Sequence, residues 1–277
     1  MPTLLKWYLG LILCFPAFSY IYYLRDNRRD HLLAFLRGKY GSSVAPLLRG
    51  YFSSVLSQGM MLLCLPLGLF PNRRPIRQGS PVLLIHGLHH NDSAWLVFAP
   101  RLRRQGYRNL HLLSYNTLTR TYPELVVEAA REAERILAAN PGKKLMLVGH
   151  SLGGLVIRGM LANPDLAPRI GAAVTLGTPY RGSTLADLGM CRLARSLRPQ
   201  HPMWRDIERL DCPPCPPVLA VYSLVDNMVF PSSSLEPPCP TWRTYICPPI
   251  SHVALLYHPS VFRRALAFIK AADTEAV

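Results

Sequence analysis

Short apolar runs alternate with longer amphipathic stretches from residue 81 to near the C-terminal end. The runs are bounded by turn residues and are too short for helices, which is typical of buried parallel strands. The stretches between them repeat their apolar residues every three or four positions, which predicts helices. We expect strands at residues 81–87, 109–116, 144–150, 170–179, 217–226 and 241–249, with helices at 93–107, 123–139, 152–161 and 260–272.

Strands that alternate with helices predict an α/β fold, a mainly parallel sheet with helices on both faces. Asp92 or Ser93 is the expected N-cap of the first of these helices. In parallel sheets, ligands bind outside the carboxyl ends of the strands. Residues that directly follow a predicted strand are therefore the first candidates for a site.

Two long apolar runs precede this pattern, at residues 4–24 and 51–70. The first is long enough for one membrane span. The second run is less hydrophobic because Ser and Gln residues interrupt its first half. It could form a second span, a re-entrant helix or an interfacial helix. No small-residue cleavage site follows the first run, which favours an uncleaved anchor over a signal peptide. We therefore divide the chain into an N-terminal membrane-anchor region with two apolar helices (1–75) and a catalytic domain (76–277).

The net charge of +15 is compatible with nucleic acid or with an anionic membrane surface. Residues 1–80 hold ten Lys or Arg against two Asp, beside the apolar runs. No zinc-finger spacing or RNP-like motif is present, so a membrane partner is favoured and nucleic acid is not expected. Six basic residues between the runs favour a cytoplasmic loop. With two spans, the catalytic domain would lie on the extracytoplasmic side of a bacterial inner membrane.

The stretch "GHSLGG" places Ser151 between Gly149 and Gly153, at the predicted turn from a strand to a helix. A serine hydroxyl needs a general base, a group that orients the base, and donors for the developing oxyanion. Glycines two positions away on either side permit the sharp turn of a nucleophile elbow. The amide of Leu152 then lies at a helix N-terminus, and the amide of Leu88 follows the first strand.

The base and the acid are expected on later loops. His252 follows the last predicted strand, whereas His258 lies closer to the last helix. His150 neighbours Ser151, and we interpret it as a packing or hydrogen-bonding residue. Asp226 ends its strand, so it is favoured as the acid over the loop residues Asp206, Asp211 and Glu236. The resulting order of Ser151, Asp226 and His252 is that of α/β-hydrolases.

The segments "LLIHGL", "GHSLGGL", "LGTPYRGS", "YSLVDNMV" and "SHVALL" resemble successive landmarks of the bacterial triacylglycerol lipase and esterase branch of the α/β-hydrolase superfamily. The resemblance covers roughly residues 80–270. It implies an α/β-hydrolase fold and esterase or lipase activity, with Ser151 as nucleophile, Asp226 as acid and His252 as base. It further implies that the amides of Leu88 and Leu152 form the oxyanion hole.

The mouth of such a site would be lined by a further set of residues that follow strands, for which a purely structural role in shaping the turns is an open alternative. These are His86, Gly87, Thr178, Pro179, Tyr180 and Arg181. Some relatives bind calcium near the histidine loop. No acidic pair lies close to His252 in the sequence, so we expect neither a metal nor a cofactor.

Residues 182–216 are too long for a plain connection and predict a cap or lid, with one amphipathic helix over 184–198. Cys212 and Cys215 form a single CxxC without a second half-site, so a zinc site is not indicated. These two residues, Cys239 and Cys247 are compatible with disulfides or with free thiols.

Hydrolysis of a carboxylic ester, in particular a lipid ester reached from the membrane, is the function that these observations favour. A membrane acyltransferase would use the same residues with an alcohol in place of water. A non-catalytic membrane protein on a hydrolase scaffold is the alternative from another class.

Overall fold

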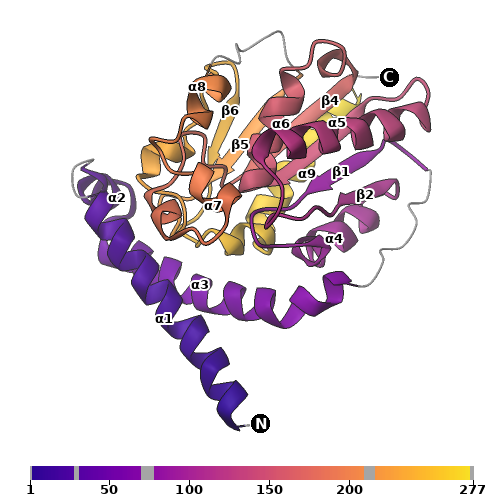
Figure 1. The fold of residues 1–277 in the computed structure, drawn as a ribbon. Helices are drawn as coiled ribbons and strands as arrows, with labels where there is room; N and C mark the ends of the chain where they lie inside the picture. Colours follow the sequence, from indigo (N-terminus) through magenta and orange to yellow (C-terminus); the bar gives the residue numbers. More distant parts are fainter. Residues whose placement is uncertain (1, 28–30, 70–77, 209–215, 275–277) are drawn as a thin grey trace.

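The computed structural model describes residues 2–27, 31–69, 78–208 and 216–274 (Figure 1). Within these ranges the strands form one parallel sheet of six strands in the order β2-β1-β3-β4-β5-β6. The expected parallel α/β architecture is confirmed. The strands are β1 (Val82–Ile85), β2 (Leu110–Leu113), β3 (Leu145–His150), β4 (Ile170–Leu176), β5 (Val218–Tyr222) and β6 (Arg243–Ile246).

Helices cover both faces of the sheet, so the central strands are apolar on both sides. Every residue of β1, β3 and β4 is buried, whereas the edge strand β6 begins with exposed Arg243 and Thr244. One face packs against α5 (Tyr122–Ala138) and α6 (Leu152–Leu161), and the other against α4 (Phe98–Arg104) and α9 (Pro259–Thr274). Figure 1 shows α5 and α6 on the near side of the sheet.

The strong helix signal before the third strand is confirmed and has a local cause. A capping box joins Thr121 and Glu124 at the start of α5, where the Glu124 carboxylate accepts from the Thr121 backbone N–H at 2.7 Å. Pro123 lies in the first turn, where its missing N–H leaves no helical hydrogen bond unmade. Ala129, Ala133 and Ile136 then bury one stripe of the helix against the sheet.

The helix expected at residues 93–107 is shorter than predicted and begins differently. A 3₁₀ turn, η2 (Asp92–Trp95), precedes α4. The cap is Asn91, whose side chain accepts from the Ser93 N–H at 3.0 Å, so the expectation of Asp92 or Ser93 was wrong. The helix ends at Arg104 because Gly106 adopts a φ of 97°, which glycine reaches without strain.

The N-terminal region forms three helices, α1 (Pro2–Asp26), α2 (Leu32–Tyr40) and α3 (Val44–Cys64), followed by a 3₁₀ turn η1 (Leu65–Leu69). Two stretches, Lys6–Asp26 and Val44–Leu69, are long and apolar enough to cross a membrane, by length and composition only. In Figure 1, α3 lies beneath the sheet domain, while α1 extends from the domain toward the N-terminus.

The segment expected to be a cap contains no single amphipathic helix. It forms a 3₁₀ turn η4 (Thr184–Leu188), then α7 (Arg192–Ser196) and α8 (Met203–Glu208). The break occurs because Gly189 is extended and Cys191 starts a new helix by accepting from the Ala194 N–H at 3.4 Å. Leu193 and Leu197 bury this segment against the α5–α6 side of the core.

The cysteines divide into two groups. Cys14, Cys64, Cys191 and Cys247 are free, whereas Cys239 is disulfide-bonded. Cys212 and Cys215 lie outside the described residues, as does Asp211.

Candidate active site

Ser151 occupies the turn between β3 and α6 in a conformation that few non-glycine residues adopt. Its φ is 55° and its ψ is −120°, and its N–H donates to the Leu176 carbonyl at 2.8 Å. Such backbone strain is concentrated at functional sites. A Cβ at Gly149 would lie 2.6 Å from the Gly153 carbonyl carbon, and one at Gly153 would collide with the Ile85 carbonyl oxygen. Gly149 is therefore required by the turn itself, and Gly153 by the close approach of strand β1.

Asp226 and His252 form a buried pair at the same edge of the sheet. His252 Nδ1 lies 2.7 Å from Asp226 Oδ2, with the carboxylate fully buried. The other carboxylate oxygen accepts from the backbone N–H groups of Met228 and Val229, both at 2.9 Å. Since Nδ1–H donates to the carboxylate, the neutral His252 ring has its free lone pair on Nε2. This is the tautomer that a general base requires.

Shared neighbours bring Ser151 close to this pair. Leu176, which accepts from the Ser151 N–H, is followed by Gly177, where a Cβ would lie 3.1 Å from His252 Nδ1 and 3.2 Å from Asp226 Oδ2. Ser151 and His252 are not hydrogen-bonded to each other here. In ligand-free active sites such bonds are often long and tighten when substrate binds.

His150 packs directly on the His252 ring. The two ring centroids are 4.7 Å apart, and His150 Nε2 donates to the His252 carbonyl oxygen at 3.2 Å. Burial, reinforced by the neighbouring His252, holds the pKa of His150 well below its usual range. Its Nδ1 has no hydrogen-bond partner among the described residues. His150 is thus a neutral support for the His252 loop, in agreement with the packing and hydrogen-bonding role predicted for it.

The two expected oxyanion donors follow β1 and β3 respectively. Leu152 is the first residue of α6, where helix N–H groups have no intrahelical partner. Leu88 follows Gly87, whose position is tightly confined because a Cβ there would lie 3.0 Å from the Ser151 Cβ. The loop after β1 therefore passes beside the nucleophile candidate, as an oxyanion role for Leu88 requires.

His86 is fully buried, and both of its ring nitrogens contact the protein. Nδ1 donates to the Gly87 carbonyl at 2.8 Å, and Nε2 accepts from the Tyr115 N–H at 3.3 Å. The ring also stacks on Tyr115 at a centroid distance of 4.1 Å. Burial lowers the pKa of His86 to about 4, so the ring is neutral near pH 7. These contacts fix the loop that carries Gly87 and Leu88; direct contact with substrate stays a prediction.

The residues after β4 differ in exposure. Thr178, Pro179 and Tyr180 are buried, and the Tyr180 hydroxyl lies 2.6 Å from Thr175 Oγ1. Arg181 is exposed and donates to the Ser233 carbonyl at 2.7 Å. Substrate contact by these four residues stays a prediction, and their observed contacts shape the turn.

Asn227, next to the acid, connects the site with the N-terminal helices. Its amide donates to Ser19 of α1 at 2.8 Å and to Ser54 of α3 at 3.0 Å, and its oxygen accepts from the His252 N–H at 3.3 Å. The neighbouring Ser251 N–H donates to Ser53 at 2.7 Å. We call this set of buried contacts the polar seam; it comprises Ser19, Ser53, Ser54, Ser57, Gln58, Asn227 and Ser251.

Comparison with known proteins identifies the family of this chain. The model of the alpha/beta hydrolase family matches residues 82–275. The chain belongs to this family.

Two curated bacterial relatives of this alpha/beta hydrolase are named triacylglycerol lipase. The one from Pseudarthrobacter phenanthrenivorans is 33% identical over 118 residues, which are 39% of this chain and 35% of the relative. The one from Burkholderia plantarii is 33% identical over 118 residues, covering 39% of this chain and 31% of the relative. The hydrolase thus matches about a third of the length of these relatives.

Solved structures agree on the fold. The lipase BlEst2 of Bacillus licheniformis in mature form has a TM-score of 0.59 at 18% identity, covering 72% of this chain and 96% of that structure. The lin2722 gene product of Listeria innocua has a TM-score of 0.54 at 16% identity, covering 69% of this chain and 94% of that structure. Both matches leave part of the hydrolase chain uncovered.

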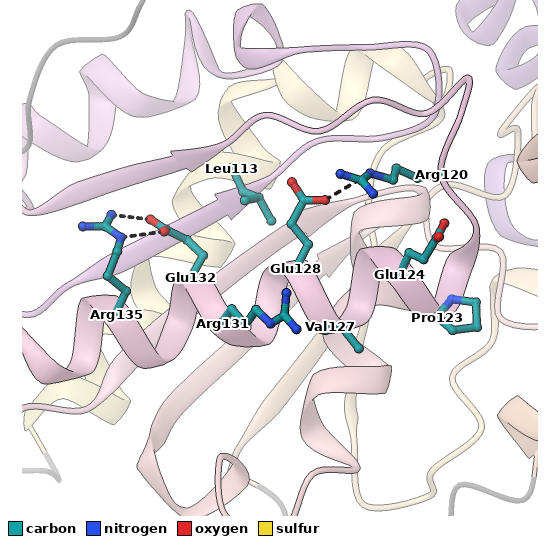
Figure 2. Close-up of a pocket in the computed structure, with 9 residues that line it drawn as sticks. All are labelled: Leu113, Arg120, Pro123, Glu124, Val127, Glu128, Arg131, Glu132 and Arg135. Carbon is teal, nitrogen blue, oxygen red and sulfur yellow. Dashed lines mark hydrogen bonds and ion pairs between the residues drawn. The ribbon is translucent and has the colours of Figure 1, made fainter.

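Figure 2 shows a cavity elsewhere, on the outer face of α5. Its walls carry alternating charges, such as Glu128 with Arg120 and Glu132 with Arg135, and it includes none of the predicted site residues. Within the described ranges, no group of three or more His, Cys, Asp or Glu side chains could hold a metal ion.

Sequence reasoning missed the polar seam. From the sequence alone, we interpret Ser53, Ser54, Ser57 and Gln58 as polar residues that dilute an apolar run, and we assign no role to Asn227. The helical spacing of Ser54, Ser57 and Gln58 was the available signal, because residues three and four apart share one helix face. Which surface that face contacts was not encoded locally.

Proposed function

We propose that this hydrolase cleaves carboxylic esters through Ser151, His252 and Asp226, with an acyl-enzyme intermediate. The observation that carries the proposal is the buried 2.7 Å contact between His252 Nδ1 and Asp226 Oδ2, at the sheet edge where Ser151 holds its strained turn. The similarity to triacylglycerol lipases over 118 residues supports the same chemistry.

In the first half-reaction, Ser151 Oγ attacks the ester carbonyl carbon while His252 Nε2 takes the hydroxyl proton. The amides of Leu88 and Leu152 donate to the oxyanion, and Asp226 stabilises the imidazolium. The intermediate collapses as His252 returns the proton to the leaving alcohol. A water molecule, deprotonated by His252, then attacks the acyl-enzyme and releases the acid and Ser151.

We further propose that the ester is a lipid and that α1 and α3 attach the enzyme to a membrane. Both helices are long and apolar, and the surrounding sequence is strongly basic. The disulfide at Cys239 supports an extracytoplasmic catalytic domain, because disulfides persist in oxidising compartments.

Labelling with a fluorophosphonate, which reacts with activated serines, tests the nucleophile. We expect the wild-type protein to be labelled. Ser151→Ala should lose the label and at least about 10³-fold of its ester hydrolysis, while it unfolds at a temperature similar to that of the wild type. Ser114→Ala removes an exposed serine at the same sheet edge and should keep both. Labelling that persists in Ser151→Ala would contradict the proposal.

A further inference from the structure

Helix α3 buries a polar face and exposes an apolar one, whereas a surface helix of a water-soluble domain does the opposite. Its buried face includes Ser54, Ser57 and Gln58, whereas apolar side chains face outward. The outward residues recur every three or four positions and form one stripe along the helix and η1. We call this the apolar stripe: Val44, Leu48, Phe52, Leu56, Met60, Leu63 and Leu67, with Leu56 75% exposed.

Hydrogen bonds join the buried face of α3 to the catalytic domain, and they would be lost if the helix moved away. Ser53 accepts from the Ser251 N–H, and Ser54 accepts from Asn227, on loops that follow β6 and β5. Near the other end of the segment, Asn91 donates to the Leu65 carbonyl at 2.9 Å. A buried polar group left without a partner destabilises a protein. Helix α3 is therefore fixed along the carboxyl edge of the sheet.

Helix α1 is fixed in the same way over its C-terminal third. The hydroxyls of Tyr20 and Tyr23 donate to the carbonyls of Val225 and Leu224 at 2.7 and 2.6 Å. The part of α1 before Tyr20 packs on α3, where the Tyr8 hydroxyl donates to the Gly59 carbonyl at 2.9 Å and Ile12 is buried. Helix α1 is thus joined to α3 near its N-terminal end and to the catalytic domain at its C-terminal end.

Exposed apolar side chains of the catalytic domain gather at the same edge. Among the described residues of 78–208 and 216–274, the large exposed hydrophobics other than Val127 lie in connections that follow strands. Leu96 follows β1, Leu118 follows β2, and Leu188 and Met190 follow β4. The site and the apolar surface thus share one end of the molecule.

The charge of this surface indicates what covers it. Arg37, Lys39 and Arg49 are exposed beside the stripe, and the sequence contains no Asp or Glu between Asp30 and Asp92. A second copy would bring like charges together, whereas anionic lipid headgroups complement them. Apolar side chains flanked by basic ones are typical of helices that lie in the membrane interface.

We propose that α3 is a monotopic interfacial helix that lies in the plane of the membrane. The apolar stripe then enters one leaflet, and the carboxyl edge of the sheet faces the bilayer. The lipid ester then reaches Ser151 directly from that leaflet. The positive-inside rule governs loops between spans, so the basic residues here reflect lipid contact and not orientation. The inference rests on the proposed membrane attachment but not on the chemistry of Ser151.

Depth-resolved fluorescence quenching, in the full-length protein bound to anionic vesicles, tests whether α3 lies in the plane of the membrane. Single cysteines replace Leu48, Leu56 and Leu63 in a background with Cys14→Ser, Cys64→Ser and Cys191→Ser, and each carries an environment-sensitive fluorophore. Lipids brominated near the headgroup or deep in the chain quench according to depth. Val127→Cys, exposed on α5, is the matched control.

An in-plane helix predicts the same shallow depth at all three positions and no quenching at residue 127. A crossing helix would place position 56 deepest and positions 48 and 63 near opposite interfaces, which would overturn the inference while leaving membrane attachment intact. A stripe covered by a second copy would show no lipid quenching in vesicle-bound protein. Failure to bind vesicles would refute the attachment itself. In each case, hydrolysis of a soluble short-chain ester reports separately on Ser151.

Discussion

The two ends of the parallel sheet differ in how their polar residues are connected. At the amino end, Asn140 donates to the nearby Ile136 carbonyl, and Asn163 accepts from the N–H groups of Asp165 and Leu166, so these residues complete local turns. One separate contact there, from the Ser80 hydroxyl to Asp273, is long-range. At the carboxyl end, the single residue Asn227 joins Ser19 and Ser54, more than 170 residues away in the sequence, and so brings distant segments together at one place.

Strain, burial and exposed apolar surface follow the same division. Ser151, with its positive φ, and the buried Asp226–His252 pair lie at the carboxyl end, beside α3 and the apolar stripe. One end of the fold thus maintains the sheet, while the other holds the proposed catalytic residues beside the surface that we propose to face lipid. Each prediction below alters the carboxyl end and uses a control that leaves it intact.

Removal of the proposed base has the largest expected effect. His252→Ala should lower kcat for a soluble ester by at least about 10³-fold, because it removes the group proposed to accept the Ser151 proton. His258→Ala is the matched control, since His258 contacts Ser260 at 2.7 Å and belongs to the start of α9. Steady-state kinetics on both variants measures the difference. Equal losses would remove His252 from the mechanism.

Acid should destabilise the carboxyl end through its buried neutral histidines. The pKa of His86 is lowered to about 4 by burial, below the usual 6.5, so the unfolded chain binds more protons between these values. The contribution of His86 to the free energy of unfolding is therefore fully present above about pH 6.5. It is lost as the pH drops toward 4, a change of about 3 kcal/mol. Denaturant unfolding at several pH values measures the slope. His86→Gln should flatten it; an unchanged slope would contradict the assignment.

Loss of the Asn227 amide should reduce activity less than loss of the base. Asn227→Ala removes the bond to the His252 N–H and the two bonds that join the site to Ser19 and Ser54, so we expect kcat to fall about 10- to 100-fold with KM for a soluble ester little changed. Asn163→Ala also removes two side-chain hydrogen bonds but lies at the amino end. A fall of kcat in both variants would indicate a general loss of stability.

The sheet could be predicted because its signals are local. Strands such as β3 and β4 are continuous apolar runs bounded by turn residues, and burial on both faces demands that composition. The elbow at Ser151 was visible because its two glycines flank the serine in the sequence, although only Gly149 is required by a local contact, with Gly153, whereas Gly153 is required by the close approach of Ile85 in β1. The candidate acid and base could be placed because both follow strands that end at one edge.

The direction in which α3 faces could not be predicted. The same periodic pattern of Ser and Leu fits a helix with either face buried, and only the positions of Asn227 and Ser251 decide between them. The prediction of a single helix in the cap segment was wrong for a related reason. A long amphipathic stretch at 184–198 suggests one helix, but extended Gly189 and the local cap at Cys191 divide it.

The central claim is that the active site opens toward the bilayer, and Leu56→Glu tests it most directly. Hydrolysis of one ester is compared in two forms, dissolved as a short-chain homologue and embedded in anionic vesicles, for wild type, Leu56→Glu and Val127→Glu. A charge in the apolar stripe should lower the vesicle rate about tenfold or more and leave the soluble rate unchanged, since ~1.4 kcal/mol of lost membrane binding is tenfold. Val127→Glu should change neither rate. Equal vesicle rates for Leu56→Glu and wild type, or a parallel loss on both forms of the ester, would contradict the account.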